Sequence, residues 1–210
     1  RAVNFNVENY FIDLGGRGAS TKAELNRQRQ RLAESVQLLD ADILALHEIQ
    51  NKPTAVDDLL AVLNANQPAD QQYAAAGLDR QPAAIRSVIF YRPARLTKIS
   101  VDQQIDPIHP RDPMAAMFRD QQGNELLVIA AHYKSRGGCP DDGDIDQGEG
   151  CWAERRNGQS QALVNWITPW LVEDLPLLVL ADFNAQAQEA PIHLLREAGL
   201  IDLLAAHVPA

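Results

Sequence analysis

The chain has 210 residues, of which 46% are hydrophobic and 22% are charged, and its formal net charge is −9. This composition indicates one ordinary globular domain over residues 1–210, and no apolar run approaches the roughly 18 residues that a membrane span needs. The acidic balance argues against a passive nucleic-acid binder, which would carry a basic face. It leaves open an enzyme that brings a divalent cation to a phosphate, because the metal ion supplies the local positive charge. The first residue is Arg1 rather than Met, so we expect a processed or trimmed product.

The first third of the chain alternates between strand and helix patterns. Four elements are expected there: a strand over 1–10, a helix from 20 or 21 to 39, a strand over 42–48, and a helix that begins at Pro53. Apolar and polar residues alternate in the first strand, which predicts that Asn6, Glu8 and Tyr10 share one face. The second strand is apolar until it ends in His47 and Glu48. This order of elements is typical of α/β folds.

The middle of the chain has hairpin patterns instead. Short β-rich runs predict strands over 87–91, 96–101, 115–119 and 126–132. Helices return later, over 152–171 and near 192–198, on either side of an apolar strand that runs into Asp182. Strands that pair with helices at first and with each other later favour an α/β fold of mixed sheets, either one sheet or a packed pair.

The stretch 177–184 is the strongest single motif, because an unbroken apolar run leads into Asp182, Phe183 and Asn184. Such a run predicts a strand that is buried on both faces. Side chains alternate along a strand, so Asp182 and Asn184 are expected to point the same way, at the strand end where α/β proteins bind ligands. The alternative is an Asx turn that only closes the strand.

Two cysteines, Cys139 and Cys151, flank a segment rich in Gly, Pro and Asp that cannot pack by itself. A disulfide between them would stabilise the protein by roughly 3 kcal/mol in the chain-entropy model. It would also indicate an exported protein. The alternative is a pair of free thiols in a cytosolic protein.

Polar side chains that can bind a metal ion or act as acid and base recur where the predicted strands end. They are Asn6, Glu48, His132, Asp182 and Asn184. Each has a structural alternative, such as an amide in a turn, a surface glutamate or a hydrogen-bonded core histidine. Together they predict a site for a hard cation, because oxygen ligands suit Mg²⁺, Mn²⁺ or Ca²⁺.

These residues lie in four short motifs, at 4–9 (NFNVEN), 46–51 (LHEIQN), 131–135 (AHYKS) and 181–184 (ADFN). In this order, over nearly the whole chain, the motifs resemble the endonuclease/exonuclease/phosphatase superfamily, which includes pancreatic-type deoxyribonucleases, abasic-site endonucleases and sphingomyelinases. Segments at 9–11, 16–19, 134–140 and 150–156 are most similar to secreted bacterial nucleases. The resemblance implies an α/β fold in four layers, a sandwich of two mixed β-sheets flanked by helices.

The resemblance also implies a metal site and cationic substrate contacts. Glu48 would ligate the divalent cation, with Asn6 beside it and Glu8 where the family often carries another acid. The expected ion is Mg²⁺ or Mn²⁺, with Ca²⁺ as an alternative. The side chains that would grip flanking phosphates, unless they are merely solvated surface charges, are Arg17, Lys134 and Arg155.

Three catalytic roles follow from the same resemblance. Asp182 would orient or deprotonate the attacking water, and Asn184 would hydrogen-bond the phosphate oxygens. His132 would contact the phosphate and assist the leaving oxygen. These roles match what phosphodiester hydrolysis requires, namely an aligned water and neutralised charge on the non-bridging oxygens.

The chain departs from the family pattern near its end. The family usually continues past residues 200–203 into strands that carry an Asp and then an Asp-His pair, and His207 follows the last predicted helix too closely to be that histidine. We therefore expect a domain that is truncated at its C-terminal end and lacks strands at a sheet edge. The acidic loop 141–149 resembles a calcium loop only weakly, because the expected Gly and Glu positions do not match.

Three functional hypotheses result. The first is a divalent-metal-dependent phosphodiester hydrolase, a secreted or periplasmic bacterial nuclease that cleaves DNA with little sequence preference. The second keeps the fold but changes the substrate to a phospholipid or a small phosphate ester. The third is a catalytically incomplete domain that binds a partner or a nucleotide. The sequence indicates no obligate protein partner.

Overall fold

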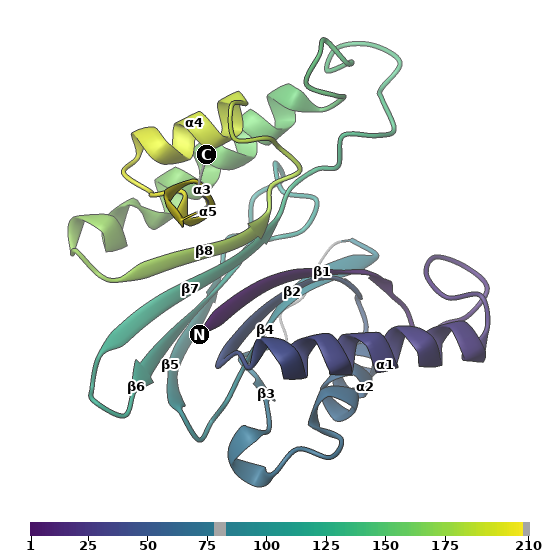
Figure 1. The fold of residues 1–210 in the computed structure, drawn as a ribbon. Coiled ribbons are helices and arrows are strands. Elements are labelled where there is room, and N and C mark those ends of the chain that lie inside the picture. The colour runs from purple at the N-terminus through teal and green to yellow at the C-terminus, as the bar shows by residue number, and fades with distance from the viewer. Residues whose placement is uncertain (78–82, 208–210) are drawn as a thin grey trace.

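The computed structural model describes residues 1–77 and 83–207, and it contains two packed β-sheets with helices outside them (Figure 1). Within the described residues, the strand order is β1-β2-β4-β3 in the first sheet and β5-β6-β7-β8 in the second. The first sheet consists of β1 (Ala2–Tyr10), β2 (Ile43–Gln50), β4 (Ile85–Tyr91) and the two-residue β3 (Ala74–Ala75). The second consists of β5 (Leu96–Gln103), β6 (Met114–Asp120), β7 (Glu125–His132) and β8 (Leu177–Asp182).

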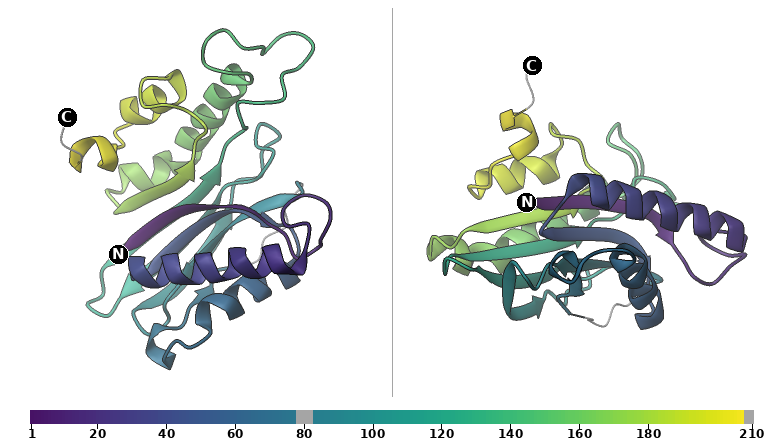
Figure 2. Two further views of the ribbon diagram at one scale, coloured as in Figure 1. Left: turned by 45° about the vertical axis from the view of Figure 1, so that its right-hand side comes forward. Right: turned by 60° about the horizontal axis from the view of Figure 1, so that its bottom comes forward.

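Helices cover the outer faces of both sheets (Figure 2). On the first sheet lie α1 (Lys22–Leu39) and α2 (Pro53–Asn64). On the second lie α3 (Ala153–Val172), α4 (Ala190–Glu197) and the short α5 (Leu203–His207). A 3₁₀ turn, η1 (Ala69–Gln71), precedes β3. No helix among the described residues is both long and apolar enough to cross a bilayer.

Three apolar clusters hold these layers together. One cluster lies between the first sheet and its helices, and another lies between the second sheet and α3 and α4. The third, which includes Ile89 and Phe118, lies between the two sheets. The order helix, sheet, sheet, helix confirms the predicted four-layer α/β sandwich.

The start of α1 shows how the sequence sets an element boundary. Thr21 is the N-cap, and its side chain accepts a hydrogen bond from the backbone N–H of Glu24 at 3.2 Å. The Glu24 carboxylate in turn accepts from the Thr21 backbone N–H, which completes a capping box. Of the two predicted cap residues, 20 and 21, the second is therefore the cap.

Two predictions about strands are wrong, one on side-chain directions in β1 and one on the burial of β8. Glu8 and Asn9 adopt left-handed backbone conformations, with φ of 56° and 55°, and the β1–β2 ladder is irregular between Asn6 and Tyr10. The alternation therefore breaks: Glu8 is exposed, whereas Tyr10 is fully buried and bonds Asp58. The six residues of β8 are half-buried rather than buried on both faces, because β8 lies at the edge of its sheet as described.

The strand directions bring several strand ends to one place. β1 pairs with β2 in parallel, and β7 pairs with β8 in parallel. The two pairs also meet each other across the sandwich, because the side-chain amide of Asn4 on β1 donates to the carbonyl of Ala181 on β8 at 2.8 Å. The carboxyl ends of β1 and β8 lie on the right-hand side of Figure 1, where the loops after β1 and β7 also emerge.

Candidate active site

Asn6, Glu48, His132 and Asp182 converge from four strands, two in each sheet, with His132 and Asp182 at the last residues of β7 and β8. The Asn6 side-chain amide donates to Asp182 Oδ2 at 2.9 Å. His132 Nε2 lies 3.7 Å from Asp182 Oδ2 and 3.8 Å from Glu48 Oε1, which is too long for hydrogen bonds. The imidazole therefore faces both carboxylates, at distances that leave its Nε2 unbonded to either of them. The sequence predicted these four residues as one site, and the structure brings them together.

Local backbone conformations position two of the polar side chains. Glu48 has φ of 68° and Asn184 has φ of 49°, values that residues other than glycine rarely adopt. Asn9, also left-handed, donates its backbone N–H to Glu48 Oε2 at 3.1 Å and so fixes that carboxylate. Such strained residues concentrate at functional sites, where the surrounding structure holds them in place.

Asp182 is held by hydrogen bonds to both of its carboxylate oxygens. Asn184 donates its backbone N–H to Oδ1 at 3.1 Å, and Asn6 donates to Oδ2. Burial by itself would raise the pKa of Asp182, but the hydrogen bond from Asn6 and the other donors lower it below its usual value. The carboxylate is therefore ionised at neutral pH. The Asx turn that the sequence left as an alternative does occur, and it supports the site instead of replacing it.

His132 is buried and neutral. Its exposed fraction is 3%, and burial together with the charge of Arg111 lowers its pKa to about 3. Its Nδ1 atom is buried and has no hydrogen-bond partner among the described residues. A neutral imidazole in this position can donate or accept one hydrogen bond through Nε2.

A buried hydrogen-bond chain that the sequence analysis missed lies behind the site. His47 Nδ1 is 2.8 Å from Ser87 Oγ, and its Nε2 is 2.7 Å from Asn4 Oδ1. Burial lowers the pKa of His47 to about 4, so one ring nitrogen donates and the other accepts. Through Asn4 the chain reaches the carbonyl of Ala181, next to Asp182. The available signal was His47 itself, a polar residue between the apolar run that ends at Leu46 and the glutamate at Glu48.

Arg111 is the second residue that the sequence analysis missed. It lies in the loop between β5 and β6, and its guanidinium donates to the backbone carbonyls of His132, at 3.1 Å, and Tyr133. Burial lowers its pKa to about 10, and the charges of Glu48 and Asp182 act in the opposite direction. The side chain is therefore cationic at neutral pH and lies close to both carboxylates. No sequence pattern distinguishes it from other loop arginines.

The three cations that the sequence did predict, Arg17, Lys134 and Arg155, interact electrostatically with Arg111. Arg17 lies over the Phe11 ring, bonds Asn9 and electrostatically affects both Arg111 and His132. Gly18 keeps this loop close to β1, since a Cβ there would lie 2.5 Å from the Asn9 carbonyl oxygen and its φ is +89°.

Lys134 and Arg155 differ in how strongly their side chains are already hydrogen-bonded within the protein. Lys134 is partly exposed, and its pKa is lowered by burial and by the nearby charges of Arg111 and Arg155. Its ammonium group makes long hydrogen bonds within its own loop, to the carbonyls of Ser135 at 3.5 Å and Gly137 at 3.4 Å. Arg155 donates to the carbonyls of Ile108, at 3.1 Å, and Pro107, at 3.2 Å, and so ties α3 to the loop before Arg111. Phosphate binding by these residues stays a prediction.

The donor set suits a divalent ion that keeps much of its own hydration. No three His, Cys, Asp or Glu side chains of the described residues are grouped closely enough to hold a metal ion by themselves. Glu48 offers a carboxylate with a side chain that is 18% exposed, and Asn6 offers an amide oxygen. Mg²⁺ is typically bound by one or two carboxylates, with waters and substrate phosphates as the remaining ligands. Glu8 lines, with Asn6, a groove of about 510 Å³ between β1 and α1, and its role as a ligand stays a prediction.

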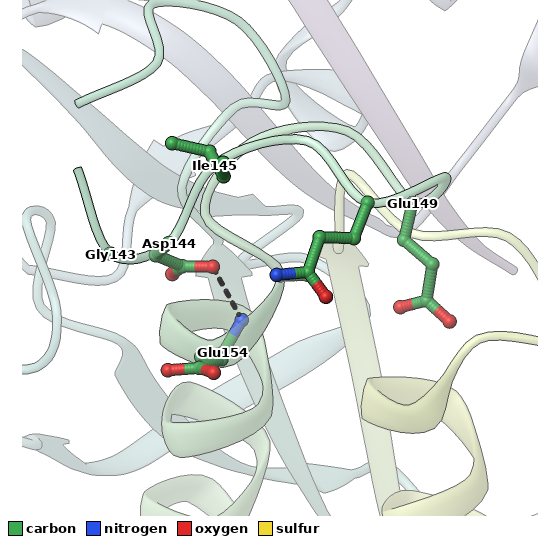
Figure 3. A pocket seen from close by; sticks show the side chains of 7 residues that line it. Gly143, Asp144, Ile145, Glu149 and Glu154 are labelled. Atoms are coloured by element: carbon green, nitrogen blue, oxygen red, sulfur yellow. Dashed lines mark hydrogen bonds between the residues drawn. The ribbon is translucent and has the colours of Figure 1, made fainter. Parts of the chain in front are cut away.

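Acidic side chains of the cysteine loop hold the backbone of the loop itself and of the start of α3. The predicted disulfide is present between Cys139 and Cys151, whose Cα atoms are 5.1 Å apart. A small cavity lies within the acidic part of the loop (Figure 3). The Asp144 carboxylate, which lines this cavity, accepts hydrogen bonds from the backbone N–H groups of Glu154, at 3.0 Å, and Arg155, at 2.9 Å. This carboxylate therefore caps the start of α3.

His109, in the same loop as Arg111, gives the protein a predictable acid sensitivity. It is buried, and burial lowers its pKa to about 4, although Asp106 partly opposes this shift. Between pH 6.5 and 4 the unfolded chain therefore takes up a proton that the folded chain does not, so stability is full above pH 6.5 and falls towards pH 4. At pH 5 this effect costs about 2 kcal/mol.

We expect His109→Gln to remove this part of the pH dependence, because glutamine does not titrate. The measurement is urea unfolding of both proteins at pH 7.5 and pH 5.0. The loss of unfolding free energy between the two pH values should be about 2 kcal/mol smaller in the variant. All other groups titrate equally in both proteins, so an identical loss in the two would refute the assignment.

Comparison with known proteins agrees with this fold. Residues 3–209 match the Endonuclease/Exonuclease/phosphatase family, and the chain belongs to this family. It is therefore an enzyme of the metal-dependent phosphodiesterase and phosphatase type, as the resemblance implied. No curated protein matches the chain significantly by sequence.

Several solved structures share the fold. A mannosyl-6-phosphatase of Bacteroides thetaiotaomicron is 18% identical, with a TM-score of 0.65 over 94% of this chain and 70% of that one. The catalytic domain of human nocturnin is 17% identical, with a TM-score of 0.63 over 91% of this chain and 67% of that one. TDP2 of D. rerio, complexed with a single-strand DNA product, is 12% identical, with a TM-score of 0.56 over 96% of this chain and 65% of that one. At identities this low, the structural likeness shows the shared fold alone. The substrate must therefore be argued from the site.

Proposed function

We propose that the chain is a nuclease that hydrolyses DNA phosphodiester bonds with little sequence preference. The observation that supports this is the ring of cations around the carboxylates of Glu48 and Asp182. Arg17, Arg111 and Lys134 come from three different loops and affect one another or His132 electrostatically. In a chain of net charge −9, such a local concentration of cations favours a polyanionic substrate. Because contacts between cations and phosphates carry no information about the base sequence, we infer low sequence preference.

The chain's own residues can perform most of the required chemistry. Ionised Asp182 accepts a hydrogen bond from the attacking water and aligns it. Asn184 already donates to the Tyr133 carbonyl at 3.3 Å, and its second amide hydrogen can bind a phosphate oxygen. Neutral His132 can donate through Nε2 to the phosphate or to the leaving oxygen. A divalent ion held by Glu48 and Asn6, Mg²⁺ or Mn²⁺ in this proposal, would supply positive charge to the non-bridging oxygens.

We also propose that the protein acts outside the cytosol, in the periplasm or in the medium of a bacterium. The support is the Cys139–Cys151 disulfide, which closes a loop with little apolar content of its own. Disulfides of this structural kind persist in oxidising compartments and are rare in the cytosol.

Cleavage of supercoiled plasmid tests the proposed function. We expect nicking in the presence of Mg²⁺ or Mn²⁺ and none with excess EDTA, because without the ion the charge on the non-bridging oxygens of the phosphate would not be neutralised. Plasmids of different sequence should be nicked at similar rates. If the chain instead hydrolyses sphingomyelin or a sugar phosphate in a metal-dependent way and leaves the plasmid uncleaved, its substrate is that phosphoester and not DNA. Nicking that persists in EDTA would refute the metal-dependent mechanism.

A further inference from the structure

Trp152 is placed unusually for a large apolar residue. It directly follows Cys151 and precedes α3, and its backbone is left-handed, with φ of 67° and ψ of 27°. Its indole N–H donates to the Gly138 carbonyl at 2.8 Å, so the ring is tied to the other side of the disulfide loop. The backbone N–H of Cys151 donates to the Arg136 carbonyl at 3.0 Å, which adds a second tie between the two sides. The indole is therefore fixed in orientation while it remains partly exposed.

The ammonium group of Lys134 lies on this indole. Lys134 Nζ is 4.8 Å from the centre of the Trp152 ring, within the range of a cation–π interaction. Lys134 is two residues beyond His132, and its backbone N–H donates to Gln159 on α3 at 2.9 Å. The lysine therefore connects the catalytic strand β7 to the aromatic ring.

The pair is electrostatically part of the site. The charge of Arg111 acts on both Lys134 and His132, and Arg111 in turn lies close to Glu48 and Asp182. A phosphate bound by Lys134 would thus be a neighbour of the phosphate at the catalytic residues.

We propose that Trp152 and Lys134 form a nucleotide subsite, in which the indole face that Lys134 does not cover stacks on a base and the ammonium group binds a phosphate next to that base. This inference rests on the proposed nuclease function, since it assigns the part of the DNA that the site recognises. An aromatic face beside a cation is the combination that binds single-stranded nucleic acid without reading its sequence, because every base has a π-face. The subsite therefore takes unpaired or locally melted nucleotides.

The disulfide gives this subsite its rigidity. Gly150 has φ of +75°, and a Cβ there would lie 2.9 Å from Arg136 side-chain atoms, so the loop folds tightly against Arg136. Arg156, fully buried, donates to the carbonyls of Cys151, at 2.7 Å, and Glu149, at 2.8 Å. A fixed indole loses little conformational freedom when a base stacks on it.

Equilibrium binding tests the subsite separately from catalysis. A fluorescently labelled single-stranded oligonucleotide is titrated in EDTA with the wild-type chain, Trp152→Leu and Trp152→Phe, and anisotropy gives each Kd. We expect Trp152→Leu to raise Kd about 5- to 150-fold, which is the effect of removing one stacked base. Trp152→Phe should stay within a few-fold of wild type, because it keeps an aromatic face.

Trp170→Leu is the matched control, because Trp170 is a half-buried tryptophan about 27 Å along α3 from Trp152. A second oligonucleotide, with abasic residues in place of all nucleotides, should bind wild type and Trp152→Leu equally. Equal Kd values for the normal oligonucleotide in wild type and Trp152→Leu, or no binding by wild type, would overturn the subsite. Base-dependent binding without plasmid nicking would instead keep the subsite and refute the nuclease.

Discussion

Asp182→Asn is expected to lower the rate of DNA hydrolysis by about 10²- to 10⁴-fold, the usual contribution of a group that handles a proton in the transition state. The variant side chain keeps the shape of aspartate and can still accept the backbone N–H of Asn184. It loses the negative charge that attracts the water's proton. It also loses the hydrogen bond from Asn6, because an NH₂ group replaces the Oδ2 atom that accepts it. The measurement is the initial rate of plasmid nicking at saturating DNA and metal ion.

Asp202→Asn is a suitable control for this effect. Asp202 also accepts backbone N–H groups just after its own position, from Leu204 and Ala205 at 3.1 Å each, but it lies between α4 and α5. Its variant should nick plasmid at the wild-type rate. A rate for Asp182→Asn within a few-fold of wild type, in a variant with unchanged thermal unfolding, would remove Asp182 from the mechanism.

The predictable part of the site comes from strand ends. Glu48, His132 and Asp182 each stand where an apolar run stops, and local sequence is sufficient to locate such a boundary. Parallel pairing then brings boundaries together, as the direct register of His132 with Asp182 shows. Local sequence also indicated the α/β class and most strand positions, and it narrowed the cap of α1 to two adjacent residues, 20 and 21.

The rest depended on contacts between distant parts of the chain. Arg111 acquires its role from the carbonyls of His132 and Tyr133, about twenty residues away, to which nothing in its own loop points. Glu8 was predicted to share a face with Asn6, but two left-handed residues in β1 break the alternation. Those residues allow Asn9 to donate to Glu48, a long-range hydrogen bond that no local periodicity can reveal.

The buried histidine chain also bears on how the two sheets work as one site. His47, on β2, connects Ser87 of β4 to Asn4 of β1, and Asn4 in turn bonds the residue before Asp182 on β8. The carboxylates of Glu48 and Asp182 belong to different sheets, so their separation depends on how firmly the sheets are joined. A satisfied buried network of this kind stiffens that junction, because breaking any one hydrogen bond leaves a polar group unpaired.

Glu48→Gln is expected to weaken divalent-metal binding at least 10- to 100-fold, the loss that is typical even for residues that only support a metal ligand. Glutamine can still accept a hydrogen bond from the Asn9 backbone N–H, so the local fold should survive while the negative charge is lost. Titration of the chain with Mn²⁺, followed by the electron paramagnetic resonance signal of the free ion, measures affinity without any turnover.

Glu149→Gln, in the acidic disulfide loop, is the control and should bind Mn²⁺ as wild type does. The opposite result, with affinity lost in Glu149→Gln and kept in Glu48→Gln, would move the ion from the strand ends to that loop. Asp182 and His132 would then act without a metal ion beside them, in conflict with the family to which the chain belongs.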